Sequence, residues 1–167
     1  TSVKDQGRCG CCWATALAGT LEGAAFLQND GYFQSLSFQQ YISCNERNLG
    51  CDGGNLIVAM GYTLLNRFGG VSRLNDYPFT DYRGKMTEEC GLDEDETPLA
   101  VTIAKPRIAF DTFPIGSFET RLQEVKQILS EQPIAMVMKS SCRLFSNYRS
   151  GVLTDDGDCA CTDAFCA

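Results

Sequence analysis

The chain has 167 residues, of which 44% are hydrophobic and 21% charged, as in folded domains and unlike disordered chains. No apolar stretch approaches the roughly 20 residues that cross a membrane, so we expect no membrane span. The net charge is −7 and the 14 basic residues form no cluster, which argues against nucleic acid as a partner.

Two residue counts narrow the class of protein. The chain contains 10 cysteines, which indicates an oxidising compartment, and no histidine. Histidine most often carries acid–base or metal chemistry near neutral pH, so a mechanism that depends on it would need a histidine from elsewhere. The sequence begins at Thr1 without a signal peptide, and we expect a processed or partial chain.

The first predicted element is a helix. Residues 12–27 are apolar on nearly every side, and the pattern stops at Asn29-Asp30-Gly31. We therefore expect a buried central helix. A glycine-punctuated loop, residues 6–11, precedes it and places Cys12 in the first turn.

Two shorter helices are expected next. Ser37, followed three residues later by Gln40, resembles a capping box and predicts a helix over 38–43. Apolar positions over 56–65 predict a third helix, which ends before a pair of glycines. No period is sustained over 71–98, where we expect loop.

Strand signals dominate after Pro98. Residues 99–103 and 107–110 are predicted strands, 134–138 is a predicted buried strand, and 148–153 is another. Between them lies a predicted helix with one apolar face, formed by Leu122, Val125, Ile128 and Leu129.

The two halves of the chain therefore differ in kind. The sequence predicts an α+β fold with a helical N-terminal lobe, residues 1–98, and a β-rich C-terminal lobe, residues 99–167. Ligand sites in such proteins commonly lie in the cleft between lobes.

The clearest chemical motif is Gln6-Gly7-Arg8-Cys9-Gly10-Cys11-Cys12-Trp13-Ala14. It fits the Cys-Gly-[Ser/Ala]-Cys-[Trp/Tyr] pattern of papain and cathepsins. A thiolate is the reactive form of cysteine, and a helix N-terminus stabilises negative charge. An isolated cysteine at a helix start would suit a structural role, but Gln6 and Trp13 at these offsets make Cys12 the candidate nucleophile.

Five further segments follow in the order that the same family shows. They are Leu36-Ser37-Phe38-Gln39-Gln40, Gly50-Cys51-Asp52-Gly53-Gly54, Tyr77-Pro78-Phe79, Gln132-Pro133-Ile134-Ala135 and Tyr148-Arg149-Ser150-Gly151-Val152. The chain thus resembles a papain-family cysteine peptidase over nearly its whole length, with a two-lobe papain-like fold.

The resemblance implies roles for the loop and the cleft. The Gln6 side chain and the Cys12 backbone N–H would form an oxyanion hole. The backbone of Gly53 and Gly54 would pair with an extended peptide substrate. Asn55, Leu56, Ile134 and Val137 would line a pocket for an apolar substrate side chain, although the last two also suit ordinary core packing.

The resemblance also implies disulfides between Cys9 and Cys51 and between Cys44 and Cys90. The family's third bridge would join Cys159 or Cys161 to a cysteine beyond this chain. The cysteines without an assigned partner are Cys11, Cys142, Cys159, Cys161 and Cys166. Their spacing lacks the paired Cys-x-x-Cys knuckles of a zinc site, so we expect no metal and no other cofactor.

The sequence departs from the family at the catalytic histidine. In papain-like enzymes this residue takes the thiol proton and later protonates the leaving amine. Asp163 is the best match to its position, since it lies a little over ten residues after Gly151 and precedes Ala164. An aspartate, with a usual pKa near 3.9, is too weak a base for a thiol, and its charge disfavours a nearby thiolate.

Three interpretations follow. The chain is part of an active peptidase, truncated at both ends, whose histidine comes from an unseen segment; or it is a pseudopeptidase that binds peptides or serves as a subunit of a larger assembly; or it is a disulfide-stapled domain with an accidental Cys-Trp motif. We expect that this chain alone hydrolyses no peptide bond. The cysteines and the family favour the secretory pathway, outside the cell or in a lysosome or vacuole.

Overall fold

A computed structural model describes residues 1–65, 69–84, 89–93, 96–103, 118–137 and 148–151. The chain forms two compact units, Thr1–Ala135 and Met136–Ala167. The lobe boundary expected between residues 98 and 99 stays a prediction. Within the described ranges, no helix is both long and apolar enough to cross a membrane.

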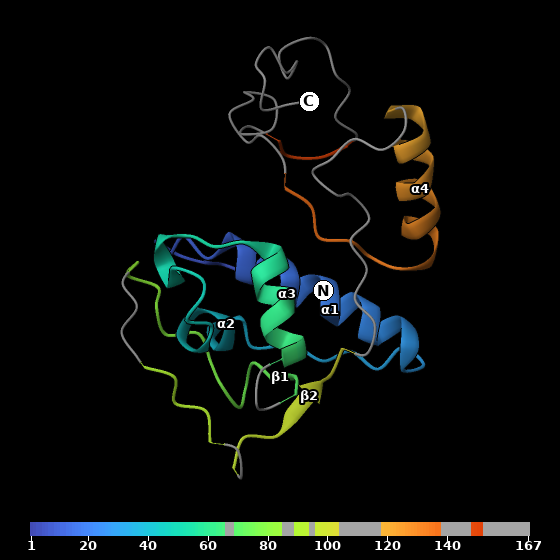
Figure 1. The fold of residues 1–167 in the computed structure, drawn as a ribbon. Coiled ribbons are helices and arrows are strands. Elements are labelled where there is room, and N and C mark those ends of the chain that lie inside the picture. The colour runs from blue at the N-terminus through green and yellow to red at the C-terminus, as the bar shows by residue number, and fades with distance from the viewer. Residues whose placement is uncertain (66–68, 85–88, 94–95, 104–117, 138–147, 152–167) are drawn as a thin grey trace. The chain divides into compact units, whose positions relative to one another are not determined.

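The first unit contains the helices (Figure 1). They are α1 (Cys12–Gln28), α2 (Phe38–Cys44), the short 3-10 helix η1 (Gly50–Asp52), α3 (Leu56–Leu65) and α4 (Phe118–Glu131). The predictions for α1, α2 and α3 are confirmed to within about one residue at each end. α1 packs against both α2 and α3 and is the central helix of this unit.

Only one face of α1 is buried. Trp13, Ala14, Leu17 and Ala18 follow the helical spacing and lie in the core, together with side chains of α2, α3 and the following loops. The expectation of burial along the whole apolar segment is wrong at its end, where Leu27 is 59% exposed. Helices α2 and α3 cover one side of α1, and an apolar sequence cannot show which side will have neighbours.

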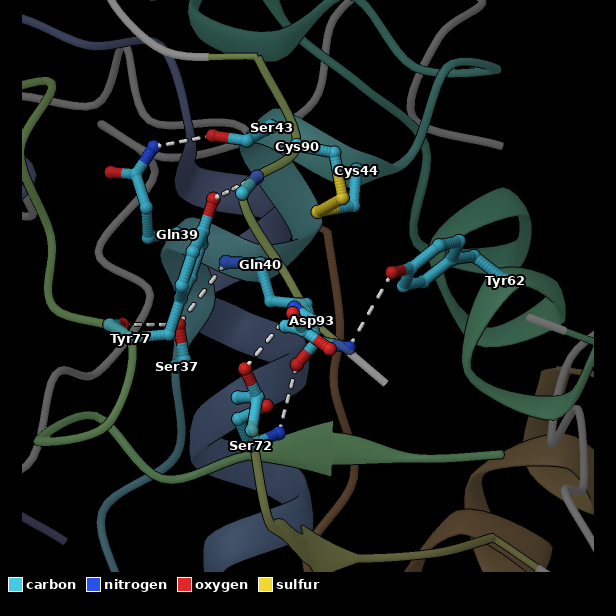
Figure 2. Close-up of a disulfide and its surroundings, with 12 residues drawn as sticks. Ser37, Gln39, Gln40, Ser43, Cys44, Tyr62, Ser72, Tyr77, Cys90 and Asp93 are labelled. Carbon is cyan, nitrogen blue, oxygen red and sulfur yellow. Dashed lines mark hydrogen bonds between the residues drawn. A yellow bond between two sulfur atoms is a disulfide. The ribbon is translucent and has the colours of Figure 1, made fainter. Parts of the chain in front are cut away.

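The cap of α2 explains how this helix joins the rest of the unit. The Ser37 hydroxyl accepts a hydrogen bond from the Gln40 N–H (3.1 Å), which confirms the predicted cap. The Gln40 side chain does not complete the capping box. Instead, its Oε1 accepts from the Ser72 N–H (2.8 Å) and its Nε2 donates to the Gly70 carbonyl (3.0 Å), so that Gln40 ties α2 to the segment before and within β1 (Figure 2).

A two-stranded antiparallel sheet lies in the first unit. It pairs β1 (Val71–Ser72) with β2 (Leu99–Val101), and Val71 lies opposite Val101. β2 confirms part of the strand predicted over 99–103. The loop expected over 71–98 is wrong at β1, because two residues are too few to show a period.

The predictions for the elements after β2 are confirmed only in part. α4 confirms the predicted helix, whose Leu122, Val125 and Ile128 are half-buried, whereas Leu129, predicted for the same apolar face, is 53% exposed. The buried strand expected over 134–138 is wrong where it is described, because residues 134–137 form no strand and Val137 is 86% exposed. A strand needs a hydrogen-bonded neighbour, and no described residue pairs with this segment. Residues 148–151 likewise form no strand, and the strand expected over 107–110 lies outside the described residues.

Candidate active site around Cys12

Cys12 is the first residue of α1, and its side chain is a free, exposed thiol. The residue before it, Cys11, makes no side-chain cap, and the first turn contains no acidic residue. The N–H groups of a first helical turn lack partners within the helix and carry partial positive charge. The Cys12 sulfur therefore lies at a helix N-terminus and is open to a reagent.

Cys11 has the opposite surroundings although it is adjacent in the chain. Its side chain is fully buried, and burial raises the pKa of its thiol to about 11, with smaller contributions from Cys12 and Asp81. Cys11 is therefore a neutral thiol at physiological pH. The two neighbouring cysteines thus differ in access, and of the two only Cys12 has the exposure of a reactive thiol.

The loop that carries Gln6 is fixed by backbone contacts. The Gln6 carbonyl accepts from the Cys9 N–H (3.1 Å), and the Gly7 N–H donates to the Asp5 side chain (2.8 Å). Gly7 has a φ of +57°, which other residues rarely adopt. Gln6 is half-buried and lies six residues before Cys12 on this ordered loop.

Both predicted disulfides are present. Cys9 bonds to Cys51, and the Gly10 N–H donates to the Cys51 carbonyl (2.7 Å), so the Gln6 loop is joined to η1. Cys44 bonds to Cys90 and joins the end of α2 to a distant loop (Figure 2). Such bridges restrict the unfolded chain and stabilise the folded unit.

Trp13 supports the glycine loop that follows η1. Its indole N–H donates to the Gly50 carbonyl (3.3 Å) inside the core. A Cβ on Gly54 would lie 2.5 Å from the Trp13 ring, so no larger residue fits there without movement. Gly53 has a φ of +117° and open space around it. Gly54, which is predicted to pair with a peptide backbone, therefore packs against Trp13, the residue next to Cys12.

Asn55, which is predicted to line the substrate pocket, also caps a helix. Its Oδ1 accepts from the N–H groups of Ile57 (2.8 Å) and Val58 (3.3 Å), which makes it the N-cap of α3. Asn48 in turn accepts from the Asn55 N–H (2.8 Å). An asparagine directly before an apolar helical run was a signal for this cap.

The remaining residues of the predicted pocket differ in burial. Leu56 packs partly buried against the core of the first unit. Ile134 is half-buried in the same unit, whereas Val137 belongs to the second unit and is exposed. Asp163 lies outside the described residues. The pocket and the role of Asp163 therefore stay predictions.

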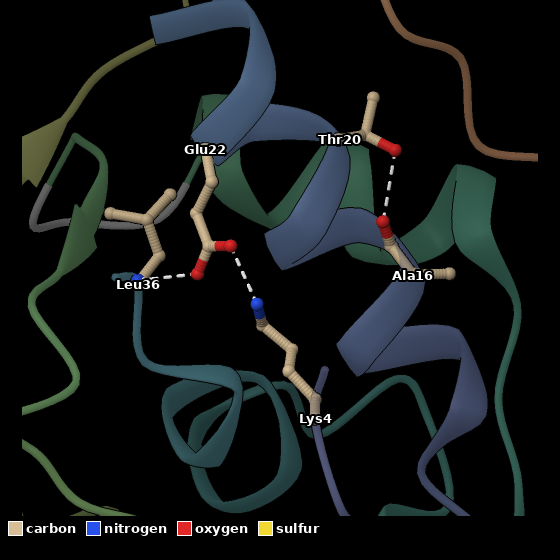
Figure 3. Close-up of polar contacts among 5 residues, drawn as sticks. All are labelled: Lys4, Ala16, Thr20, Glu22 and Leu36. Atoms are coloured by element: carbon tan, nitrogen blue, oxygen red, sulfur yellow. Dashed lines mark hydrogen bonds and ion pairs between the residues drawn. The ribbon is translucent and has the colours of Figure 1, made fainter. Parts of the chain in front are cut away.

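A buried ion pair anchors the segment that leads to Gln6. The Lys4 ammonium group lies 2.5 Å from a carboxylate oxygen of Glu22, and the other oxygen accepts from the Leu36 N–H (2.8 Å) (Figure 3). Glu22 is fully buried on α1. This pair was not predicted, although Glu22 is the only charged residue between Trp13 and Leu27, and charged residues inside apolar helices usually have a partner.

The described part of the chain contains no cluster of three or more potential metal ligands. Chemically, the arrangement offers an exposed thiol at a helix N-terminus and an ordered loop that carries an amide side chain. A thiol can add to a carbonyl carbon, and amide N–H donors can stabilise the oxyanion that results.

Comparisons with known proteins place this site in a family. Residues 1–165 match the papain family of cysteine proteases. Cysteine proteinase 2 of Leishmania pifanoi is 35% identical over 154 residues, which cover 92% of this chain and 32% of that protein. A viral cathepsin of Adoxophyes honmai nucleopolyhedrovirus is 34% identical over 153 residues, which cover 92% of this chain and 40% of that protein.

Solved structures give the same result for the fold. The crystal structure of the Carica candamarcensis cysteine protease CMS1MS2, a complex with E-64, superposes with a TM-score of 0.68 at 25% identity, over 92% of this chain and 64% of that chain. The chain spans about a third to two fifths of the length of the two curated relatives above. The chain belongs to the papain family of cysteine proteases, and its fold is of the papain-like α+β class.

Proposed function

We propose that this chain is a papain-like peptidase domain in which Cys12 is the nucleophilic thiol. The observation that carries the proposal is the contrast between adjacent cysteines: Cys12 is exposed at the N-terminus of α1, whereas Cys11 is buried and neutral. The family match supports peptide bonds as the reaction class. The Gln6 side chain and the Cys12 backbone N–H are the proposed donors to the oxyanion.

The proposed substrate is an extended peptide. Gly53 and Gly54 would pair with its backbone, because residues without side chains allow a close approach of two chains. Asn55, Leu56, Ile134 and Val137 would border the pocket for an apolar side chain. Since Asn55 caps α3 with its side-chain oxygen, it would contribute its position rather than a free acceptor.

Peptide hydrolysis needs a proton carrier as well as a nucleophile. The base takes the thiol proton, and the same group then protonates the leaving amine so that the tetrahedral intermediate collapses to the acyl-enzyme. The chain contains no histidine, and a carboxylate at Asp163 would neither hold that proton near neutral pH nor favour the thiolate. We therefore propose that this chain, as it stands, does not turn over peptide substrates.

A pseudopeptidase is the second candidate, and the same absence of histidine favours it. In this case the cleft would bind peptides without cutting them, or the domain would serve as a subunit of a larger assembly. An active peptidase that obtains its histidine from a segment outside this sequence is the competing proposal. For either, the proposed setting is the secretory pathway, outside the cell or in a lysosome or vacuole, because disulfides persist in oxidising compartments.

Thiol labelling with mapping of the modified peptides tests the nucleophile. The 167-residue chain is treated with iodoacetamide and, separately, with a peptidyl epoxide, and both reactions are followed by mass spectrometry. We expect Cys12 to react with iodoacetamide far faster than Cys11, and to react with the epoxide no faster than a small free thiol does. Labelling of Cys11 before Cys12 would contradict the role of Cys12, and fast epoxide labelling would contradict the missing base.

A further inference from the structure

The loop that carries Gln6 contacts a second loop that is distant in sequence. The Arg8 N–H donates to the Tyr82 carbonyl (3.0 Å). Tyr82 lies in a turn over residues 81–84, which the Gly84 N–H closes by donating to the Asp81 carbonyl (3.0 Å). We call residues 81–84 the positioning turn.

Glycines on both sides make this contact close. A Cβ on Gly7 would lie 2.6 Å from the Tyr82 carbonyl oxygen, and a Cβ on Gly84 would lie 2.6 Å from the Arg8 carbonyl oxygen. Heavy atoms that are not hydrogen-bonded do not approach so closely, so a side chain at either position would push the two loops apart. Gly84 also has a φ of +80°, so the turn itself requires glycine.

Gln39 connects the positioning turn to α2. Its Oε1 accepts from the Thr80 N–H (2.9 Å), and its Nε2 donates to an Asp81 carboxylate oxygen (2.7 Å). The same Nε2 donates to the Ser43 hydroxyl (2.8 Å), and Figure 2 shows Gln39 directed toward Ser43. Gln39 and Asp81 are both fully buried. The turn is therefore fixed to the core by a side chain whose polar atoms are all used.

We propose that the positioning turn sets the position of the Gln6 amide, and that Gly84 and Gln39 are positioning residues for the oxyanion hole. The inference rests on the proposed function, because it assigns Gln6 to that hole. The Gln6 loop is joined to η1 through Cys51 and to the positioning turn through Tyr82 and Gly84. An oxyanion donor acts over a narrow range of distances, roughly 2.7–3.1 Å, so a small displacement of the loop weakens it.

A peptidyl aldehyde tests this role without peptide hydrolysis. The Cys12 sulfur bonds to the aldehyde carbon, the carbon–oxygen double bond becomes a single bond, and the thiol proton moves to that oxygen. No group leaves, and the oxygen of the resulting hemithioacetal lies where the oxyanion would form. Trp13 is the single tryptophan of the chain and adjoins Cys12, so its fluorescence reports the dissociation constant.

Gly84→Ala is the main variant, and Gly31→Ala is its matched control. Gly31 has a φ of +82°, so alanine there meets the same backbone strain, but its Cβ would touch only the Phe26 ring at 3.6 Å. We expect Gly84→Ala to weaken aldehyde binding about fivefold, Gln6→Ala about tenfold, and the double variant no more than Gln6→Ala alone. Gly31→Ala should bind as the unaltered chain does, and the rate of iodoacetamide alkylation at Cys12 should not change in Gly84→Ala or Gly31→Ala.

A second pair of variants tests the same proposal if Gly84→Ala does not fold. Gln39→Ala removes the bonds to Thr80 and Asp81, whereas Ser43→Ala removes only the other partner of Gln39. We expect the first to weaken aldehyde binding and the second to leave it unchanged.

The outcomes separate the two claims. Unchanged affinity in Gly84→Ala or Gln39→Ala, or effects that add to that of Gln6→Ala, would overturn the role of the turn. Affinity that does not depend on Cys12 or Gln6 would overturn the proposed function, and the inference with it.

Discussion

The two compact units differ in how firmly their described residues are fixed. In the first unit, the Gln6 loop, α1 and the glycine loop are joined by a disulfide, buried hydrogen bonds and a buried ion pair. In the second unit, Met136, Val137 and residues 148–151 are exposed and form no strand, and the Tyr148 hydroxyl donates to the Gly151 carbonyl (2.7 Å) at the surface. Of the described residues, those around Cys12 therefore have the more extensive bonding.

The residues predicted to carry the chemistry are also unevenly distributed along the sequence. The cysteine, the amide and the glycines of the family's motif all lie within the first 54 residues, in the part of the chain with a described core. The sequence contains no histidine, and Asp163 stays the predicted match to the position of the family's catalytic histidine. The proposed nucleophile, Cys12, thus lies among packed and bonded residues, whereas the sequence contains no histidine to carry the proton.

The largest expected difference between the two units concerns the Cys9–Cys51 disulfide. It closes a loop of 42 residues, and loop-closure entropy gives about 4 kcal/mol of stabilisation for that length. Replacing both cysteines by alanine should therefore lower the free energy of unfolding, measured with urea, by about 3–4 kcal/mol. Val137→Ala, the comparison variant in the second unit, should alter the free energy of unfolding by less than about 0.5 kcal/mol. Equal effects would contradict the comparison.

The ion pair between Lys4 and Glu22 gives the next largest expected effect on the free energy of unfolding. Lys4→Met leaves the buried Glu22 carboxylate without its cation, and breaking a buried pair costs about 3 kcal/mol. Removing the surface hydrogen bond of the second unit by Tyr148→Phe should cost less than about 0.5 kcal/mol. Urea unfolding of the two variants compares them. A small effect of Lys4→Met would show that the pair does not anchor the segment before Gln6.

The burial of Cys11 predicts a dependence on pH. Its thiol has a pKa raised from 9.0 to about 11 in the folded chain. Between these values the unfolded chain loses the proton while the folded chain keeps it, so the free energy of unfolding falls as the pH rises from about 9 to 11. The fall should be on the order of 2 kcal/mol. In Cys11→Ala this contribution should disappear from unfolding curves recorded across that range, and an unchanged pH profile would contradict the burial of the thiol.

Two glycines should respond to alanine in opposite directions. Gly54→Ala places a Cβ 2.5 Å from the Trp13 ring and should destabilise the chain by about 1–2 kcal/mol. Gly61 lies within α3, and its Cβ would meet nothing within 4 Å, so Gly61→Ala should stabilise the chain by about 0.5–1 kcal/mol through helix propensity. Thermal unfolding measures both. The same sign for both variants would show that Trp13 does not support the glycine loop.

The elements predicted correctly are those whose signals are local. Helical periodicity and caps indicated α1, α2 and α3, and the motif around Cys12 indicated a helix start at that residue. β1 was missed because a two-residue strand has no period, and it exists through its pairing with β2. The strand expected over 134–138 is wrong at its described residues, 134–137, for the converse reason, since an apolar sequence without a bonded neighbour among the described residues does not form a strand.

The contacts that fix the site depend on distant partners. Local sequence identified Ser37 as a cap, but it could not show that Gln40 would bond to Ser72 and Gly70 rather than close a capping box. Likewise, no local signal showed that Gln39 would bond to Thr80 and Asp81, or that Gly84 would lie against the loop of Gln6. The cap by Asn55 is the exception, because its signal was present in the sequence.

Turnover of a fluorogenic peptidyl amide by the 167-residue chain tests the central claim most directly, with Cys12→Ala as the control. We expect the same background rate for both, because the nucleophile is present without a group that can transfer its proton. A rate that exceeds the background and is lost in Cys12→Ala would contradict this claim, and would show that the chain completes peptide hydrolysis without histidine.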